Sequence, residues 1–160
     1  MKQGLDPIEN ESCETLILGS LPGDISIKLQ QYYAHPRNHF WHIVAALLTE
    51  PLYEDYSERC AMLLRHKVAL WDVLHAAERE GSLDSSIKNG QPNDLERFLR
   101  EHPRIRQIIL NGSTAGKCFE KHFPNLDIPH VVVRSSSPIP AKECNTLEEK
   151  TVLWRRAWIL

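Results

Sequence analysis

Four short apolar runs along the chain predict buried β-strands. A strand covered on both faces is apolar at nearly every position and lacks the alternation of a half-exposed strand. Between and after these runs lie segments with apolar residues three and four positions apart, the spacing of one helical face. Alternating strands and helices predict an α/β fold, a three-layer sandwich with a four-stranded parallel sheet flanked by helices. The runs are Thr15–Leu18, Val68–Trp71, Ile105–Leu110 and Val131–Val133.

Start and stop signals delimit the predicted helices. Asn38 can cap a helix that Pro51 ends, because its side chain can accept a hydrogen bond from the first turn. Asn93–Glu96 and Thr146–Glu149 both match the pattern of a capping box, and Pro103 ends the first of the two helices that they begin. The helices are predicted over residues 40–48, 57–66, 95–102 and 113–122, with a fifth from residue 147 onward.

A polar loop follows each predicted strand. The loops are Gly19–Gly23, Asp72, Asn111–Gly112 and Arg134–Pro138. Because parallel strands end at the same edge of a sheet, we expect the four loops to meet there and to form a ligand site. Residues 1–13 are polar and are predicted to be a loose N-terminal arm on a single domain that spans residues 1–160.

Composition narrows the class of protein. A chain of 160 residues suits one domain with one substantial core. The formal net charge of −2 does not indicate nucleic-acid binding, although a local basic patch is sufficient for it. The four cysteines form no CxxC pair, and no signal peptide, lipidation motif or long apolar span is visible. We therefore expect a protein of the reducing cytoplasm that makes no use of a membrane.

The first of these loops and the segment that follows it contain the most informative chemistry. Gly19–Gly23 follows a strand, and paired aromatic residues and polar groups come next at Tyr32–Trp41. This combination favours a flat ligand with polar edges, such as a nucleobase. A phosphate-binding loop at Gly112–Lys117 is one residue too short, and Cys118 stands where a Ser or Thr is required.

A metal centre is the other reading of the segment at 32–41. His35, His39 and His42 could suggest one, but no carboxylate or cysteine nearby completes a ligand set. We expect His39 and His42 on the outer face of the helix. We therefore predict neither a metal nor a cofactor.

Six short motifs in order resemble one known family. The chain resembles the uracil-DNA glycosylase superfamily from about Thr15 to its end, and most of all its hypoxanthine-DNA (deoxyinosine) glycosylase branch. The resemblance implies a four-stranded parallel sheet flanked by helices and excision of a deaminated base from DNA without metal or cofactor. The motifs are GSLPG at 19–23, QYYAHPRNHFW at 31–41, LWDVL at 70–74, GSLDSSI at 81–87, LNG at 110–112 and SSSP at 135–138.

The resemblance also implies roles for single residues. The mismatch-specific branch carries a catalytic Asn where this chain has Leu21, and many branches carry a His in the last loop, which here holds serines. In the hypoxanthine branch catalysis is assigned to the Asn of the PRNxFW segment, here Asn38, which would direct a water at the sugar C1′. Tyr33 would stack on the extruded base, and Asn111 would read its edge. Asn38 as a plain helix cap and Asn111 as a turn residue are the simpler structural readings.

The remaining candidates belong to the loops. The backbone amides of Leu21 and Gly23 could hydrogen-bond the base, since glycines allow close approach of backbone to ligand. Asp72 and Asp84 are the nearest carboxylates and could act as a general base or hold a loop. Three serines, Ser135, Ser136 and Ser137, would bind flanking phosphates, and Ile139 would wedge into the gap left by the base. Ordinary loop and core roles are the alternatives, as is solvated surface charge for three further candidate phosphate contacts, Arg37, Arg134 and Lys142.

The expected activity is therefore hydrolysis of the bond between deoxyribose and hypoxanthine. No catalytic lysine is indicated near the motifs, so we expect no Schiff base and no strand cleavage. The alternatives are a uracil or G/T-mismatch glycosylase on the same fold, against which Leu21 argues, and a non-catalytic module that binds damaged bases. The expected partner is DNA containing a deaminated base, and the protein is expected to be a monomer.

Overall fold

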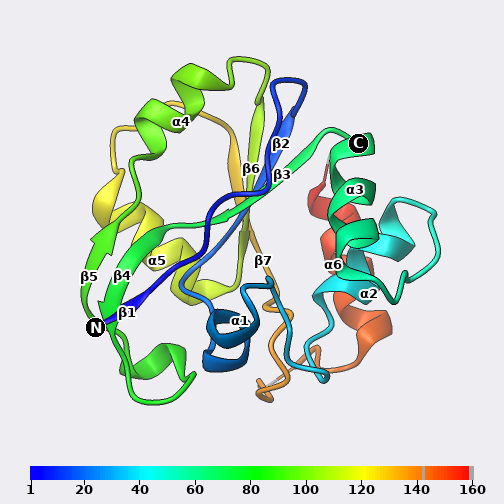
Figure 1. Ribbon diagram of the computed structural model, residues 1–160, viewed down its shortest axis with the longest axis horizontal. Coiled ribbons are helices and arrows are strands. Elements are labelled where there is room, and N and C mark those ends of the chain that lie inside the picture. Colours follow the sequence, from blue (N-terminus) through cyan, green and yellow to red (C-terminus); the bar gives the residue numbers. More distant parts are fainter. Residues whose placement is uncertain (142, 159–160) are drawn as a thin grey trace.

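The four predicted strands form one parallel sheet in the computed structural model of the protein, which describes residues 1–141 and 143–158. Lys142, a candidate phosphate contact, lies outside the described residues. The strand order is β3-β2-β6-β7 and every pairing in it is parallel, which confirms the predicted fold (Figure 1). The strands are β2 (Thr15–Gly19), β3 (Val68–Asp72), β6 (Gln107–Asn111) and β7 (His130–Val133).

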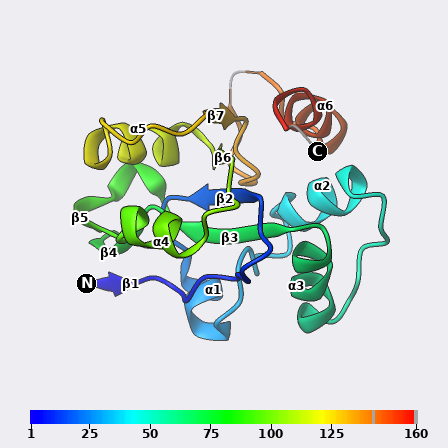
Figure 2. The ribbon, with the colours of Figure 1, turned by 90° about the horizontal axis from the view of Figure 1, so that it is seen from above.

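Helices cover both faces of this sheet, as Figures 1 and 2 show. Successive side chains of a strand point to opposite faces. Ile17 accordingly packs into the core beneath one group of helices, whereas Leu16 and Leu18 pack into the core on the other face. The first group is α2 (Phe40–Leu47), α3 (Tyr56–Arg65) and α6 (Leu147–Ala157), and the second is α4 (Leu95–Glu101) and α5 (Ser113–His122).

The helix signals in the sequence are largely confirmed. Thr146 and Glu149 form the complete capping box at the start of α6. At α4 the cap is Asp94, whose side chain accepts from the backbone of Arg97, so the predicted box at Asn93–Glu96 is shifted by one residue and lacks its second half. The short helix α1 (Asp24–Leu29) was not predicted from the sequence. Among the described residues, no helix is both long and apolar enough to cross a lipid bilayer.

A second, smaller sheet was not predicted, and it contradicts the loose N-terminal arm. Its order is β1-β4-β5, with antiparallel pairings. Leu5 and Cys13 are buried, and Ile8 pairs with Leu70 at the free edge of β3. Residues 1–13 therefore form part of the fold. The strands are β1 (Lys2–Gln3), β4 (Leu74–Glu78) and β5 (Lys88–Pro92).

The arm is held by partners that are distant in sequence. The Tyr32 hydroxyl donates to the Asp6 carbonyl at 2.8 Å, and the indole of Trp41 donates to the Tyr32 carbonyl at 2.9 Å. A polar segment shows no hydrophobic periodicity, so its own residues carry no signal for such docking. The prediction failed because pairing with a strand edge satisfies backbone groups whatever the side chains are.

Candidate active site

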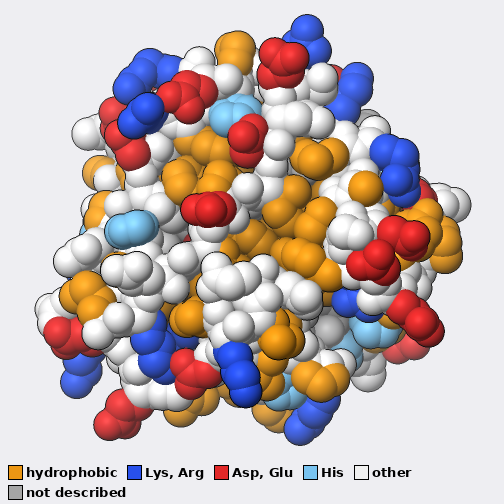
Figure 3. Space-filling view, in the orientation of Figure 1, with side chains coloured by type: hydrophobic (Ala, Val, Ile, Leu, Met, Phe, Trp, Pro, Cys, Tyr) orange, Lys and Arg blue, Asp and Glu red, His pale blue; other side chains and the backbone are white. Residues whose placement is uncertain are grey.

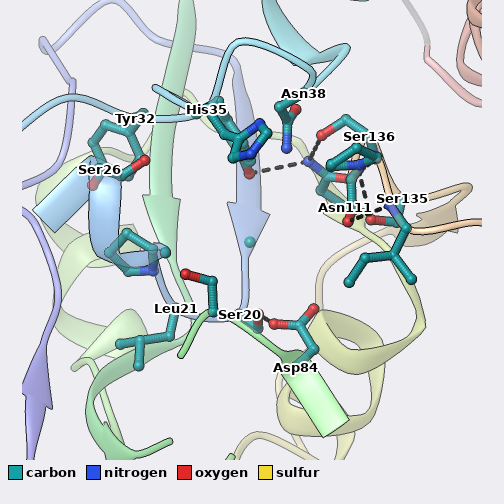
Figure 4. A pocket seen from close by; sticks show the side chains of 18 of the residues that line it. Ser20, Leu21, Ser26, Tyr32, His35, Asn38, Asp84, Asn111, Ser135 and Ser136 are labelled. Atoms are coloured by element: carbon teal, nitrogen blue, oxygen red, sulfur yellow. Dashed lines mark hydrogen bonds between the residues drawn. The ribbon is translucent and has the colours of Figure 1, made fainter. Parts of the chain in front are cut away.

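The loops that follow the four parallel strands line one cavity of about 310 Å³. Residues from all four predicted loops contribute to its wall, so the expectation that these loops meet at one edge is confirmed. Figure 4 shows the cavity with Asn38 on one side, Asp84 on the opposite side and Leu21 on a third. The segment before Asp84 adds Ser82 and Leu83, which follow β4 of the small sheet.

The first loop is held by its carbonyl groups. The Ser20 carbonyl accepts from the Leu74 backbone amide at 3.1 Å, and the Leu21 carbonyl accepts from Nη1 of Arg79 at 3.1 Å. The Pro22 carbonyl accepts from the other terminal nitrogen of Arg79. In a trans peptide the N–H points opposite to the C=O, so the amides of Leu21 and Gly23 point away from these partners. Neither amide has a hydrogen-bond partner among the described residues, and both remain able to donate to a ligand in the cavity.

Gly19 leaves the space at the floor of the cavity. A Cβ at this position would lie 2.5 Å from Oδ1 of Asp72 and 2.8 Å from the Tyr33 hydroxyl. Real Cβ atoms do not approach other atoms so closely, and both neighbours belong to buried groups with little freedom to move. The glycine is therefore required by the close packing of an acid and a phenol against one strand end.

Tyr33 presents one face of its ring to the cavity. Its other face stacks on Phe40, with ring centroids 4.1 Å apart. The backbone of Tyr33 has a φ of +53°, which is an outlier for an aromatic residue and is found mostly at functional sites. Burial raises the pKa of the hydroxyl, which stays protonated and accepts a hydrogen bond from Nδ2 of Asn111 at 3.1 Å. This geometry suits the predicted stacking role.

The position of Asn38 is compatible with both roles that the sequence left open. Its Oδ1 accepts from the backbone N–H of Phe40 at 2.9 Å, at the start of α2. The amide nitrogen consequently points the other way, into the cavity, as Figure 4 shows. His39 is the formal cap of the helix and donates its backbone N–H to the Ser136 carbonyl. The helix thus orients Asn38 as a hydrogen-bond donor toward the ligand space.

Asn111 is engaged with the protein itself. Its Nδ2 donates to the Ser136 hydroxyl at 2.9 Å and to the Tyr33 hydroxyl, while its Oδ1 accepts from the Ser136 backbone N–H at 2.9 Å. Both amide hydrogens are therefore used, and one lone pair of Oδ1 remains for a base edge. Base reading by Asn111 stays a prediction. The observed contacts show that Asn111 fixes the last loop through Ser136.

The same contacts engage one of the residues predicted to bind a phosphate. Ser136 is 0 % exposed, and both its hydroxyl and its backbone N–H are bonded to Asn111. Its backbone N–H is therefore used inside the protein, and phosphate binding by its hydroxyl remains a prediction. Ser135 and Ser137 are half-buried, and each hydroxyl accepts from a backbone amide two residues later. Phosphate binding by these two residues remains a prediction.

The tip of the last loop is exposed where the sequence predicted a wedge. The Ile139 side chain is 50 % exposed, although the wedge itself remains a prediction.

Arg134 organises the loop from inside. Its guanidinium donates to the carbonyls of Ser135, Ile139 and Cys144 and to the side chain of Asn145. Most of the N–H groups of Arg134 are therefore occupied and do not face a ligand.

Two carboxyl groups give the cavity its electrostatic character. Asp72 is buried, its Oδ2 has no hydrogen-bond partner in the described structure, and burial raises its pKa to about 7. Asp84 accepts from the Ser20 hydroxyl at 2.9 Å and lies 3.7 Å from Arg79, and partial burial raises its pKa as well. The cavity therefore favours a neutral ligand over an anion, because ionised carboxylates repel a phosphate.

The histidines do not assemble a metal site. Among the described residues, no group of three or more His, Cys, Asp or Glu side chains could hold an ion. His42 is exposed, whereas His39 is half-buried and its Nδ1 faces the ammonium of Lys150 at 3.2 Å. Burial and this neighbouring cation lower the pKa of His39. The outer position predicted for both histidines is confirmed for His42 alone.

Comparison with known proteins settles the family. A family model for the uracil DNA glycosylase superfamily matches residues 7–158. The chain belongs to this superfamily. Within it, the chain is 42% identical over 138 residues to a protein of Methanosarcina acetivorans named hypoxanthine DNA glycosylase, a match that covers 86% of this chain and 87% of that one.

Two further members are similar over most of their length. A hypoxanthine DNA glycosylase of Methanosarcina barkeri is 41% identical over 117 residues, which are 72% of this chain and 74% of that protein. A solution NMR structure from Methanosarcina acetivorans, provisionally described as a uracil DNA glycosylase, superimposes with a TM-score of 0.81 at 34% identity and covers 98% of both chains. The shared superfamily fold thus extends through the loops that form the cavity.

Two charged residues of this superfamily member escaped the sequence analysis. Arg79, directly after β4, holds the first loop, and Lys150 supports the last loop from α6. Each stands next to glutamates in a charged stretch, which is typical of solvated surface, so no local pattern marks it. Only their burial, at 7 % and 1 % exposure, separates them from the other Lys and Arg side chains.

Proposed function

We propose that this protein is a monofunctional DNA glycosylase that hydrolyses the bond between deoxyribose and hypoxanthine in DNA. The observation that carries the proposal is the orientation of Asn38, whose oxygen is held by the start of α2 while its amide donor faces the cavity. The names of the similar Methanosarcina proteins support hypoxanthine as the base. The products are free hypoxanthine and an abasic site, and the reaction belongs to the repair of deaminated adenine.

The extruded base stacks on the free face of Tyr33 in this proposal. The amides of Leu21 and Gly23 belong to the wall of the cavity and have no partner among the described residues, and they suit the O6 and N7 acceptors of hypoxanthine. When the bond to C1′ breaks, its electron pair stays on the departing purine. Donors that are positioned in advance stabilise that charge without any reorganisation, which is the most effective form of electrostatic catalysis.

Water supplies the oxygen that replaces the base at C1′. Asn38 holds this water as a donor and orients it, but an amide does not accept its proton at neutral pH. Asp72 and Asp84 are the carboxyl groups among the described residues that line the cavity, so we assign the proton of the water to this pair. No lysine is among the described residues of the wall, in keeping with direct hydrolysis and not with an imine intermediate.

The test uses end-labelled duplexes that carry one deoxyinosine, one deoxyuridine or one deoxyxanthosine. Each is incubated with the protein in EDTA, and abasic sites are then cleaved with alkali. We expect release of hypoxanthine, and a loss of roughly 10²- to 10³-fold in Asn38→Ala, the cost of removing one positioned donor. Asn38→Ser is the matched control, because its hydroxyl keeps an acceptor for the helix start but cannot reach the cavity.

The two variants separate catalysis from capping. If Asn38→Ser retains the melting temperature of the wild type and is as inactive as Asn38→Ala, the amide acts on the substrate. Release of uracil without hypoxanthine would move the protein to another branch of the superfamily. Binding of the deoxyinosine duplex without release of any base would identify a non-catalytic damage-binding module.

We also propose that the protein acts as a monomer in the cytoplasm. Its four cysteines are free, which supports a reducing compartment. Sedimentation of the protein with and without a deoxyinosine duplex tests the monomer, because a dimer on DNA would double the mass added per duplex.

A further inference from the structure

A second hollow lies on the other side of the last loop from the base cavity. We call it the basic groove, and it has a volume of about 440 Å³. The base cavity and the basic groove share Pro138 and Ile139 as a common wall. In Figure 3, histidine and Lys or Arg side chains lie at the lower right with Asp or Glu side chains beside them, where Figure 1 places this loop and the start of α6. The polar residues that line the groove are Arg37, His39, His42, Asn145 and Lys150.

Lys150 is the unusual member of this group. It is 1 % exposed, although it carries an ammonium group. Its Nζ donates to the Ser137 carbonyl at 3.0 Å and to Nδ1 of His39 at 3.2 Å. An ammonium has three N–H donors, so one is left over, and no carboxylate of the described residues forms an ion pair with it. A buried charge without a counter-charge is costly and calls for an explanation.

The other groups around the groove increase the positive potential. Because Nδ1 of His39 accepts from Lys150, the ring proton sits on Nε2, which is a further donor. Arg37 and His42 are exposed on the rim, and the cation of Arg134 lies near enough to lower the pKa of Lys150, as burial does. Glu148 is an acidic neighbour, and its charge acts on His39. The donors and charges of this groove suit an anion.

We propose that the basic groove binds a phosphate of the DNA strand next to the extruded nucleotide, with Lys150 as its main charged contact. The inference rests on the proposed function, since it assigns a second contact of the same substrate. A nucleotide whose base enters the cavity must carry its backbone across the wall at Pro138 and Ile139. The next phosphate then reaches the groove on the far side.

This placement also explains why the ammonium is buried. Lys150 holds the Ser137 carbonyl, Ser136 is latched to Asn111, and Asn111 contacts Tyr33 in the base cavity. A phosphate at Lys150 therefore binds to the same rigid loop that forms the wall of the cavity. Correct seating of the backbone and correct seating of the base become parts of one arrangement.

The test neutralises the phosphate and the lysine separately. Duplexes with one deoxyinosine receive a single methylphosphonate, which removes one charge, at each position flanking the lesion. Binding is measured with protein that carries Asn38→Ala, so that the substrate stays intact. We expect one position at which neutralisation weakens binding roughly ten- to a hundredfold, the range for a charge-assisted hydrogen bond. In protein that also carries Lys150→Met, the methylphosphonate at this position should no longer weaken binding.

The salt dependence gives a second readout. Lys150→Met should lower the slope of log K against log salt by about 0.9, the value for one released counterion. Lys121→Met, an exposed lysine on α5 outside the groove, is the matched control and should leave the methylphosphonate pattern unchanged. Methionine replaces a buried ammonium by an apolar chain of similar length, so we expect the protein to remain folded.

Several outcomes would overturn the inference. The first is that, with Lys150 intact, neutralising any flanking phosphate leaves the binding affinity unchanged. This result can be obtained even if the Lys150 variant fails to fold. The second is a sensitive phosphate whose effect persists in Lys150→Met, since the contact would then lie elsewhere. Both results are distinct from failure of the proposed function, which would show as absence of base release from the unmodified deoxyinosine duplex.

Discussion

The base cavity and the basic groove are neighbours with opposite electrostatics. They share the wall at Pro138 and Ile139, yet the cavity holds Asp72 and Asp84 whereas the groove holds Lys150. The carboxylates of the cavity disfavour an anion, whereas the groove suits one. A nucleotide has an uncharged base and a charged phosphate. The cavity therefore suits its base, and the groove on the other side of the same loop suits its phosphate.

The two regions also differ in how they are built. The base cavity lies at the ends of parallel strands, and its loops are held by a continuous sheet and by Arg79. The basic groove lies between the start of α2, the start of α6 and the last loop, and it depends on side-chain contacts of Lys150 and His39. We therefore expect changes in the cavity to affect chemistry, and changes in the groove to affect binding.

The largest expected effect comes from filling the cavity. Gly19→Ala puts a methyl group against Asp72 and Tyr33, so base release should fall a thousandfold or more, about 4 kcal/mol. Binding of a duplex with a stable abasic analogue, which has no base to insert, should change less than twofold. The measurements are single-turnover release and equilibrium binding. Equal losses of release rate and of affinity would mean that the cavity and the groove do not act separately. Gly4→Ala, outside the cavity, serves as the control.

The next effect concerns the charge of the cavity floor. Burial raises the pKa of Asp72 to about 7, from an ordinary value of about 3.9. An acid whose pKa is raised in the folded state stabilises the protein below pH 4, and this contribution is lost as the pH rises to 7. Asp72→Asn should therefore leave the free energy of unfolding unchanged at pH 4 and raise it by up to about 4 kcal/mol at pH 8. Chemical denaturation at both pH values tests this.

The sign of the pH dependence is what matters for Asp72. If Asp72→Asn raises the free energy of unfolding by the same amount at both pH values, burial does not raise the pKa of this carboxyl. The exposed Glu80→Gln variant should show no difference between the two pH values that approaches this size.

A smaller effect is expected at the stacking face. Tyr33→Leu removes the aromatic surface, so kcat/KM for hypoxanthine release should fall by about 1–3 kcal/mol, roughly 5- to 150-fold. Tyr33→Phe keeps the ring on Phe40 and loses only the acceptor for Asn111, so it should retain most of the activity. Affinity for the abasic duplex should be unchanged in both. A loss as large in the Phe variant would assign the role of Tyr33 to its hydroxyl.

The smallest effect tests the groove through its helix. Thr146→Ala removes the capping box of α6 at a cost of about 1 kcal/mol, or 2–4 °C in melting temperature. DNA affinity should fall a few-fold because the start of α6 carries Lys150, while base release from bound substrate should not change. Single-turnover rates at saturating protein measure the second quantity. A slower chemical step would show that α6 also supports the cavity.

Much of this architecture could be predicted from the sequence. The apolar runs identified β2, β3 and β6, because strands buried on both faces have to be apolar nearly throughout, and also the edge strand β7, which is only partly buried. The capping box at Thr146–Glu149 marked the start of α6, since both of its hydrogen bonds are local. The convergence of four polar loops at one edge followed from parallel topology.

Tertiary structure alone decided what the polar and charged residues do. Residues 1–13 form part of the fold, with Lys2–Gln3 in a second sheet and Ile8 paired with β3, and Ser136 is a buried partner of Asn111. Arg79 and Lys150 hold loops that lie 58 and 13 residues away from them in the sequence. Apolar residues reveal their place through periodicity, because burial acts on all of them alike. A polar residue is placed by one specific partner, and that partner is known only when the chain is folded.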